Sequence, residues 1–445
     1  MPSSAMTIVL LFLTSLLVSA VVATVPFKNT FEFVNDGDFG EYINEYDASY
    51  RPLLLGASGL LQYCFYNTTP NAYTLALRMA TKRSESDRIW VWEANRGKPV
   101  GERAVFALLS TGNLVLAEPD GRIVWQSNTA NKGVVGYDTL PNGNMVLYDA
   151  KQRYVWQSFD SATDTLLVDQ YLKLGGTTKL VSRASTELNA NGAYSLEMAS
   201  TRLAMYYTSP VDSQRYQYFS SSQWFNLQKG PLRQVTLVTS PKEDNATLFE
   251  ISLNYQVNNS TSGSIILSRA RYNPKYSYMR LGIDGNLKIY IYDDNADSGD
   301  AWQTAFTLFS RDSIWATECE LPSRCGNYGL CIEDQCVACP TGKLGSPTGP
   351  LLGWNKNCTT QTIKSCSSND FYYYQLIGVD HFSLQYTSGD GPMSQTACFA
   401  KCTNNCKCKG FFYHTDTQRC WAVNDLKTLI SVDNNNHLAF IKAPK

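Results

Sequence analysis

Apolar and polar residues alternate along two consecutive segments of this chain that share one sequence. Residues 112–127 begin Gly-Asn-Leu-Val-Leu and reach Val-Trp-Gln-Ser, and residues 143–158 repeat this pattern 31 positions later, with Met for the first Leu. In each copy the alternation breaks at a turn, at 118–121 or 149–152, as it does in a β-hairpin. Equivalent hairpins at a fixed spacing favour a repeated array of sheets that buries a shared core.

A degraded third copy precedes these two hairpins. Ile89-Trp90-Val91-Trp92 lies 33 residues before Val124-Trp125. Three equivalent hairpins predict a prism with approximate threefold symmetry. The tryptophans at this shared position, Trp92, Trp125 and Trp156, could stack on sugars, but a repeated position favours aromatic residues of the core.

Two strings around these hairpins carry a family resemblance. Val91-Trp92-Glu93-Ala94-Asn95-Arg96 and residues 156–167, Trp-Gln-Ser-Phe-Asp-Ser-Ala-Thr-Asp-Thr-Leu-Leu, resemble the bulb-type (monocot mannose-binding) lectin domain. The form is the one found in S-locus glycoproteins and related secreted plant glycoproteins. The resemblance implies a β-prism lectin domain over residues 24–174.

The β pattern restarts after a Gly-Gly-Thr-Thr linker at 175–178. Segments 192–198, 203–207 and 281–292 have strand patterns, and residues 283–290 carry the Gly-Asn-Leu signature again. We expect a second, more divergent bulb-type lectin-like domain over residues 175–314.

Length, charge and the start of the chain limit the class of protein. The 445 residues suffice for roughly three or four domains. A net charge of -1 gives no electrostatic reason to expect nucleic acid as a partner. The apolar run from Thr7 to Val22 ends in Val21-Val22-Ala23, so residues 1–23 are predicted to be a signal peptide. The run is shorter than the ~20 residues that span a bilayer, and no later segment is a candidate span.

The predicted location is therefore secreted and extracellular, in the apoplast or cell wall. Sequons agree with this location, since their asparagines can carry glycans there. These asparagines are Asn67, Asn245, Asn258, Asn259 and Asn357.

Cysteine usage changes abruptly along the chain. Only Cys64 precedes residue 319, and it reads as a small buried hydrophobic residue, with an intermolecular bridge as the alternative. The twelve later cysteines predict up to six disulfides in a secreted chain. They are Cys319, Cys325, Cys331, Cys336, Cys339, Cys358, Cys366, Cys398, Cys402, Cys406, Cys408 and Cys420. A zinc half-site at Cys336 and Cys339 is disfavoured, because no His is close and no second pair has matching spacing.

The first five of these cysteines resemble an EGF-like module, which we place at residues 315–362. The spacing from Cys398 to Cys420 is similar to the PAN/apple domain that ends S-locus-type ectodomains, here residues 363–445. That resemblance implies the bridges Cys398–Cys420 and Cys402–Cys408. The expected fold is mostly β, with tandem β-prism domains followed by small disulfide-rich EGF-like and PAN/apple (α+β) modules.

The whole order resembles that of the EP1-like epidermis-specific secreted glycoproteins. An enzyme is not expected: the three histidines, His381, His414 and His437, have no nucleophile motif nearby. No cofactor and no metal are expected. Expected partners are mannose-containing glycans or glycoproteins, a protein bound through the PAN domain, and a second copy in a dimer.

The sugar site of the bulb-type lectin family is Gln-x-Asp-x-Asn-x-Val-x-Tyr on one strand. The first hairpin reads Leu109, Thr111, Asn113, Val115 and Ala117 at these positions. The second reads Leu140, Asn142, Asn144, Val146 and Tyr148. The frame in the second domain reads Gly282, Asp284, Asn286, Lys288 and Tyr290.

The degenerate frame predicts a secreted lectin-like glycoprotein with weak mannose-type carbohydrate binding, and one alternative stays open. Weak mannose-type binding would be carried by Asn142, Asn144, Val146 and Tyr148, or by Asp284, Asn286 and Tyr290. Losing two or three hydrogen bonds of about 0.5 to 1.5 kcal/mol would weaken it by roughly one to three decades. Alternatively, the asparagines serve turn and strand structure, the sugar site is lost, and the protein is a non-catalytic recognition or structural glycoprotein of the cell wall.

Overall fold

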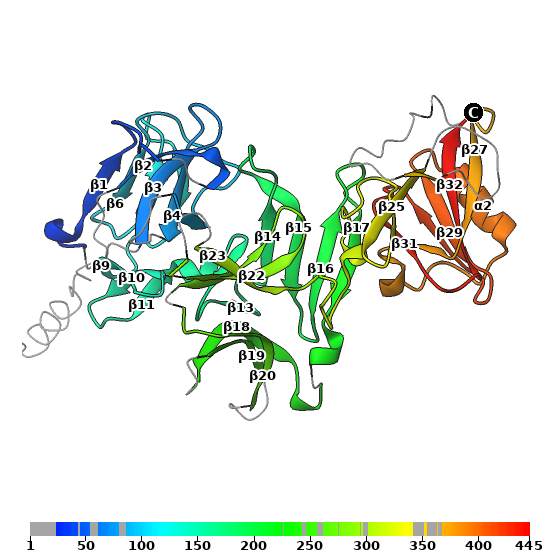
Figure 1. Ribbon diagram of the computed structural model, residues 1–445. Coiled ribbons are helices and arrows are strands. Elements are labelled where there is room, and N and C mark those ends of the chain that lie inside the picture. Colours follow the sequence, from blue (N-terminus) through cyan, green and yellow to red (C-terminus); the bar gives the residue numbers. More distant parts are fainter. Residues whose placement is uncertain are drawn as a thin grey trace, which may run out of the picture. The chain divides into compact units, whose positions relative to one another are not determined.

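The computed structural model describes residues 24–445 except 43–44, 54–60, 80–85, 226, 243–245, 256–260, 275, 294, 297–300, 341–350, 354–362 and 364–366. Strands dominate the described chain, which confirms the expected mostly β fold (Figure 1). The chain divides into two compact units. Unit 1 comprises the residues up to Asp38 with Val100–Ser158, and unit 2 comprises Phe39–Pro99 with Phe159–Lys445. The predicted signal peptide lies outside the described residues.

Unit 1 contains the two predicted hairpins. Its first sheet has the order β1 (Phe31–Val34), β6 (Val105–Leu108), β7 (Leu114–Ala117), β8 (Ile123–Gln126), and its second the order β11 (Tyr154–Gln157), β10 (Met145–Asp149), β9 (Val134–Thr139). Leu116 pairs with Trp125 across the first hairpin and Leu147 with Trp156 across the second. The register shifts directly after each of these leucines, so the two hairpins are equivalent down to the bulge.

Unit 2 contains the third copy. The strands β2 (Ser49–Pro52), β3 (Leu61–Asn67), β4 (Thr74–Met79) and β5 (Ile89–Glu93) form one antiparallel sheet in that order. Leu77 on β4 pairs with Trp92 on β5, and the register again shifts after the leucine. The degraded sequence copy therefore keeps the pairing of the two clear copies. Cys64 is a thiol buried in this sheet beside Tyr66, Ala76 and Trp90.

Three further four-stranded sheets follow in unit 2. The first has the order β12 (Thr165–Leu167), β21 (Ser277–Leu281), β22 (Leu287–Tyr292), β23 (Trp302–Thr307). The second has the order β13 (Tyr171–Lys173), β18 (Leu232–Pro241), β19 (Thr247–Tyr255), β20 (Thr261–Ala270). The third has the order β14 (Lys179–Arg183), β15 (Asn191–Met198), β16 (Leu203–Thr208), β17 (Arg215–Ser220). Their inward residues, such as Leu196, Leu237 and Ile289, meet in one apolar core. β12 and β13 precede the predicted linker at 175–178 yet pair with strands beyond it.

The last sheets build the C-terminal region. One has the order β26 (Leu351–Gly353), β25 (Gln335–Pro340), β24 (Leu330–Ile332), β31 (Leu429–Ser431), β28 (Val379–His381), and the other β27 (Phe371–Ile377), β32 (His437–Pro444), β29 (Gly410–His414), β30 (Arg419–Val423). β24 belongs to the predicted EGF-like module and β31 to the predicted PAN domain, and they pair in parallel. The two modules therefore share a sheet, and their division into domains stays a prediction.

Helices are short throughout the described chain. The 3₁₀ turns are η1 (Phe27–Asn29), η2 (Glu45–Asp47), η3 (Ser158–Ser161), η4 (Ser222–Trp224), η5 (Leu227–Lys229), η6 (Glu318–Glu320) and η7 (Leu384–Tyr386). The one α-helix among the described residues, α2 (Gln395–Thr403), is capped by Ser394, whose Oγ accepts from the Ala397 N–H. Beside β29 in Figure 1, α2 carries Cys398 and Cys402 on its buried face. No helix of the described residues is long and apolar enough to cross a membrane.

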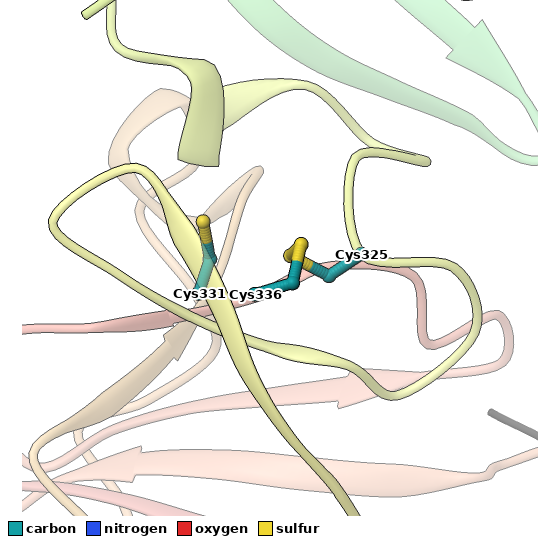
Figure 2. A group of neighbouring side chains, drawn as sticks. All are labelled: Cys325, Cys331 and Cys336. Atoms are coloured by element: carbon teal, nitrogen blue, oxygen red, sulfur yellow. A yellow bond between two sulfur atoms is a disulfide. The ribbon is translucent and has the colours of Figure 1, made fainter. Parts of the chain in front are cut away.

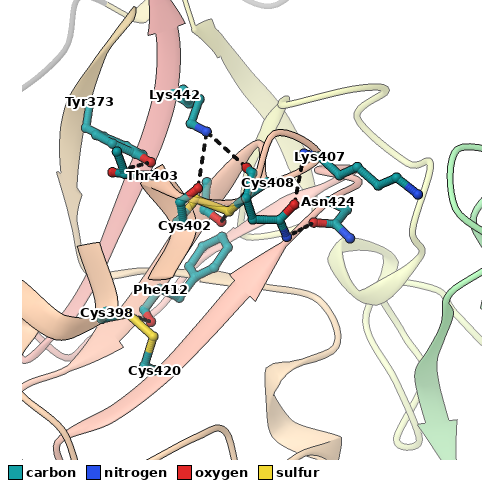
Figure 3. Close-up of a disulfide and its surroundings, with 12 residues drawn as sticks. Tyr373, Cys398, Cys402, Thr403, Lys407, Cys408, Phe412, Cys420, Asn424 and Lys442 are labelled. Carbon is teal, nitrogen blue, oxygen red and sulfur yellow. Dashed lines mark hydrogen bonds between the residues drawn. A yellow bond between two sulfur atoms is a disulfide. The ribbon is translucent and has the colours of Figure 1, made fainter. Parts of the chain in front are cut away.

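Disulfides bind the C-terminal region together. Cys319–Cys331 and Cys325–Cys336 cross-link the EGF-like part, and Figure 2 shows the second of these bridges. Cys398–Cys420 and Cys402–Cys408, the two pairings that the family resemblance implied, tie α2 to β30 and to the turn that follows the helix (Figure 3). Cys406 is also disulfide-bonded. Cys358, Cys366 and the side chain of Cys339 lie outside the described residues.

Candidate functional site

The structure places Asn144, the centre of the predicted sugar-binding strand, inside unit 1. The residue is 4% exposed. Its Nδ2 donates to Gln157 Oε1 at 2.9 Å, and its Oδ1 accepts from Ser158 Oγ at 3.4 Å. The amide therefore holds the start of β10 against the residues that end β11. Val146 on the same strand is also buried.

The asparagines at the same frame position in the other two hairpins do the same work. Asn113 donates to Gln126 Oε1 at 2.7 Å and accepts from the backbone N–H of Thr129 at 3.0 Å. Asn286 donates to the carbonyl oxygen of Phe309 at 2.9 Å and accepts from its N–H at 3.1 Å. All three asparagines are buried. The position is thus structural in a copy that lacks the family's Tyr, at Ala117, as well as in copies that keep it.

The residue after the Trp-Gln or Trp-Glu-Ala string completes each hairpin of the first three sheets. Ser127 Oγ accepts from the Leu114 N–H and Ser158 Oγ from the Met145 N–H, both at 2.9 Å. In the third copy Asn95 Oδ1 accepts from the Leu75 N–H at 2.9 Å. A side-chain oxygen therefore satisfies a buried strand N–H at each copy.

The frame position two residues before each asparagine faces solvent. Asn142 and Asp284 are both exposed. Asn142 Oδ1 accepts from the Asn144 N–H at 3.2 Å, and Asp284 Oδ1 accepts from the Asn286 N–H at 2.9 Å. The other Asp284 oxygen lies 3.5 Å from Lys288 Nζ. Each side chain closes a tight turn and keeps polar atoms available to solvent.

The frame tyrosines are half-buried and lie on neighbouring residues of their own sheets. The hydroxyl of Tyr148 covers Gly136, where a Cβ atom would lie only 2.4 Å from it. Tyr290 stacks on Tyr278, with ring centroids 4.9 Å apart. Among the three tryptophans at the repeated position, Trp92 is buried. Trp125 and Trp156 pack edge to face, with ring centroids 5.8 Å apart. These contacts are the packing of aromatic residues within a sheet protein.

A buried charge network in unit 2 connects the two strings that carried the family resemblance. Arg96 Nη2 pairs with Asp164 Oδ2 at 2.9 Å, and the Arg96 guanidinium also pairs with Glu93. Arg183 Nη1 donates to the hydroxyl of Tyr66 at 2.8 Å and lies 3.6 Å from Glu93. The network ties the end of β5 to the residues before β12 and to β14. Both strings carried the family resemblance, but no local pattern in the sequence identifies Asp164 as the partner of Arg96.

Burial and neighbouring charges together set the pKa values within this network. Burial would raise the pKa of Asp164, but the neighbouring Arg96 and Arg280 outweigh it and hold that pKa below its usual value. Burial, reinforced by Glu93, raises the pKa of Tyr66 well above its usual value. The carboxylate of Asp164 is therefore a permanent anion at neutral pH. Asp160, in the same string, instead pairs with Lys173 at 2.8 Å near the surface.

Other candidate chemistry is engaged in the fold. The cluster of Cys325, Cys331 and Cys336 consists of disulfide sulfurs, which do not offer thiolates to a metal (Figure 2). His381 hydrogen-bonds to Ser383 Oγ at 2.8 Å, and burial lowers its pKa to about 3. It is a neutral core residue at physiological pH.

The predicted sequons fall mostly outside the described residues. Asn245, Asn258, Asn259 and Asn357 are among the residues that the structure does not describe. Asn67 ends β3 and is buried. Glycosylation stays a prediction at all five positions.

Comparison with known families supports the reading of the motifs. Residues 89–187 match the model of the D-mannose binding lectin family, and residues 227–343 match the S-locus glycoprotein domain. The first match contains Glu93, Arg96, Asp164 and Arg183 of the buried charge network and both clear hairpins. The second covers strands β18 to β23 and the start of the disulfide-rich region.

Curated relatives match over nearly the whole chain. EP1-like glycoprotein 3 of Arabidopsis thaliana is 43% identical over 98% of this chain and 97% of its own length. The epidermis-specific secreted glycoprotein EP1 of Daucus carota is 50% identical over 80% of this chain and 92% of its own. A G-type lectin S-receptor-like serine/threonine-protein kinase of Arabidopsis thaliana is 25% identical, over 76% of this chain and 40% of the kinase.

Among solved structures, the two-domain fetuin-binding agglutinin of Scilla campanulata aligns with 54% of this chain and 96% of its own. The identity is 17% and the TM-score 0.18. The fold assignment therefore rests on the strand pairing described above.

Proposed function

Because this chain belongs to the family of EP1-like secreted glycoproteins, we propose that it is a secreted, non-catalytic recognition glycoprotein that uses lectin-like sheets as a scaffold. It acts in the extracellular space, in the apoplast or cell wall. Its partner is a protein or glycoprotein, and the PAN-like region is one candidate surface for it.

The observation that carries this proposal is the shared role of Asn113, Asn144 and Asn286. In the family's sugar site this amide contacts mannose, whereas here each amide is buried and bonded to its own hairpin. Burial keeps these amides from a sugar, and a sugar hydroxyl that displaced one of the hairpin bonds would leave a buried partner unsatisfied, at a cost of about 1 to 3 kcal/mol. A shallow site near millimolar affinity does not survive that cost.

The test is a glycan array on the secreted protein, followed by titration with oligomannose under monovalent conditions. Monovalent conditions matter because avidity on an array can make a very weak site look specific. The proposal expects no saturable mannose binding that depends on Asn144. Affinity capture with cell-wall extract should then retain a protein or glycoprotein that competing mannose does not release.

Weak mannose-type binding is the second candidate, and the exposure of Asn142 and Asp284 favours it. Each lies six positions before a half-buried tyrosine of the same frame, Tyr148 or Tyr290. Asp284 is the stronger candidate of the two because it keeps the family's carboxylate, a charged acceptor that binds hydroxyls more strongly than an amide does. Loss of mannose retention in Asp284→Ala, with Asn113→Ala unchanged, would favour this candidate over the first.

A further inference from the structure

We propose that Asp380, His414 and His437 form a binding site for a divalent transition-metal ion of the zinc class. His414 Nε2 lies 3.0 Å from Asp380 Oδ1, and His437 Nδ1 lies 2.8 Å from Asp380 Oδ2. One ligand atom of each residue lies within 4.8 Å of the other two. The proposal is independent of any sugar or protein partner.

The fold brings these residues together from three strands of two sheets. His414 ends β29 and His437 begins β32, and the two are direct cross-strand partners at the end of that ladder. Their rings stack with centroids 3.4 Å apart and planes 14° from parallel. Asp380 lies in the middle of β28, which belongs to the other sheet and pairs with β31. Separations of 34 and 23 residues along the chain hide the cluster from sequence analysis.

The donor set suits zinc. Imidazole nitrogen and carboxylate oxygen bind Zn²⁺ at about 2.0 to 2.2 Å, so two donors on one tetrahedral ion lie roughly 3.3 Å apart. His414 Nε2 and His437 Nδ1 lie 3.0 and 2.8 Å from different oxygens of Asp380, and a bound ion would replace these two hydrogen bonds. An imidazole whose proton is on the ring nitrogen that faces away from Asp380 offers its inner nitrogen as a ligand. Because the two rings lie in nearly parallel planes, they would rotate about their side-chain bonds to turn both nitrogens toward one ion.

The site is open enough for an ion to reach it. The three side chains are 13%, 15% and 19% exposed, for His414, Asp380 and His437. Trp421 packs against His414, with ring centroids 4.5 Å apart, and covers one side of the imidazole. Three protein ligands leave at least one coordination position for water or for a donor group of another molecule. The bound ion would join the two C-terminal sheets and offer an external ligand a point of attachment.

Titration of the secreted protein with zinc tests the proposal. The protein, with its disulfides intact, is stripped with a chelator and titrated with ZnCl₂ by calorimetry. We expect one ion per chain. Asp380→Asn, His414→Asn and His437→Asn should each weaken binding at least tenfold. Asp416→Asn, an exposed carboxylate two residues from His414, is the matched control and should bind zinc as the wild type does.

Zinc K-edge X-ray absorption of the loaded wild type needs no variant and stays decisive if a substitution prevents folding. The proposal expects two imidazoles, oxygen ligands and no sulfur. Sulfur in the first shell, absence of saturable zinc binding, or binding unchanged in all three folded variants would overturn it.

Discussion

The sheets of residues 31–307 (the prism sheets) and the C-terminal region (residues 315–445) hold their strands together by different means. In the prisms, buried amides and hydroxyls of Asn113, Asn144 and Ser158 connect the two strands of a hairpin, and an ion-pair network around Asp164 connects sheets of unit 2. In the C-terminal region, four disulfides between described residues connect the strands and the helix, and all lie between Cys319 and Cys420. The same contrast appeared in the sequence as the abrupt change in cysteine usage.

The difference teaches where a family signature must be interpreted with care. In the C-terminal region the signature residues are cysteines, which in an oxidising compartment form structural disulfides. In the prisms the signature residue is an asparagine, which can bind sugar or hold a hairpin. Only the direction of its side chain distinguishes the two, and here it points into the fold.

Reduction of the disulfides should give the largest difference in stability between the two regions. Each native disulfide contributes about 2 to 5 kcal/mol to a small domain, so reduction should unfold residues 319–420 and leave the prism sheets folded. Hydrogen exchange measured with and without a reductant would locate the loss of protection. Earlier loss in β7 or β10 than in β29 would contradict the contrast between the two regions.

Asp164→Asn should give the next largest effect. It leaves Arg96 with one fewer anion in a buried site, and breaking a buried pair costs about 3 to 5 kcal/mol. Denaturant unfolding at neutral pH measures the loss. Asp160→Asn is the matched control in the same string, and its half-exposed pair with Lys173 should contribute less than about 1 kcal/mol.

The same pair predicts a pH dependence. Because the pKa of Asp164 is lowered in the folded state, its contribution is present above the unfolded value of about 3.9 and is lost as pH falls through the lower folded value. The wild type should therefore lose part of its stability below about pH 4. Asp164→Asn should lose less stability than the wild type as the pH falls below about 4. Equal losses in the two proteins would show that Asp164 does not cause this pH dependence.

Asn144→Ala and Asn113→Ala should destabilise the protein to a similar, smaller extent. Each leaves buried hairpin partners unsatisfied, at about 1 to 3 kcal/mol. Asn142→Ala, on the exposed side of the same turn, serves as the comparison and should cost less. A silent Asn113→Ala beside a damaging Asn144→Ala would mean that the two hairpins are not equivalent.

Asp284→Asn should have the smallest effect on stability. The substitution keeps the oxygen that accepts from the Asn286 N–H and removes only an exposed charge pair, worth about 0 to 1 kcal/mol. Thermal unfolding checks this expectation. A fall in mannose affinity without a fall in stability would promote the second candidate function.

Sequence reasoning anticipated the repeats well, because a hairpin signal is local. The Gly-Asn and Val-Trp strings predicted two equivalent hairpins, and even the degraded copy at Trp92 pairs as the others do. Contacts between residues far apart in the chain could not be predicted from the sequence. No local pattern reveals that Arg96 meets Asp164, or that His414 and His437 meet at Asp380. Nor does alternation say whether Asn144 faces solvent, since both faces of β10 are buried at Val146 and Leu147.

Titration of the wild type and of Asn144→Ala with oligomannose, under monovalent conditions and at millimolar sugar, tests the central claim most directly. If the hairpin asparagines serve the fold, the wild type shows no saturable binding that Asn144→Ala removes, and the variant differs from it only in stability. Saturable binding to the wild type that disappears in a folded Asn144→Ala protein would contradict the claim and make Asn144 a sugar ligand.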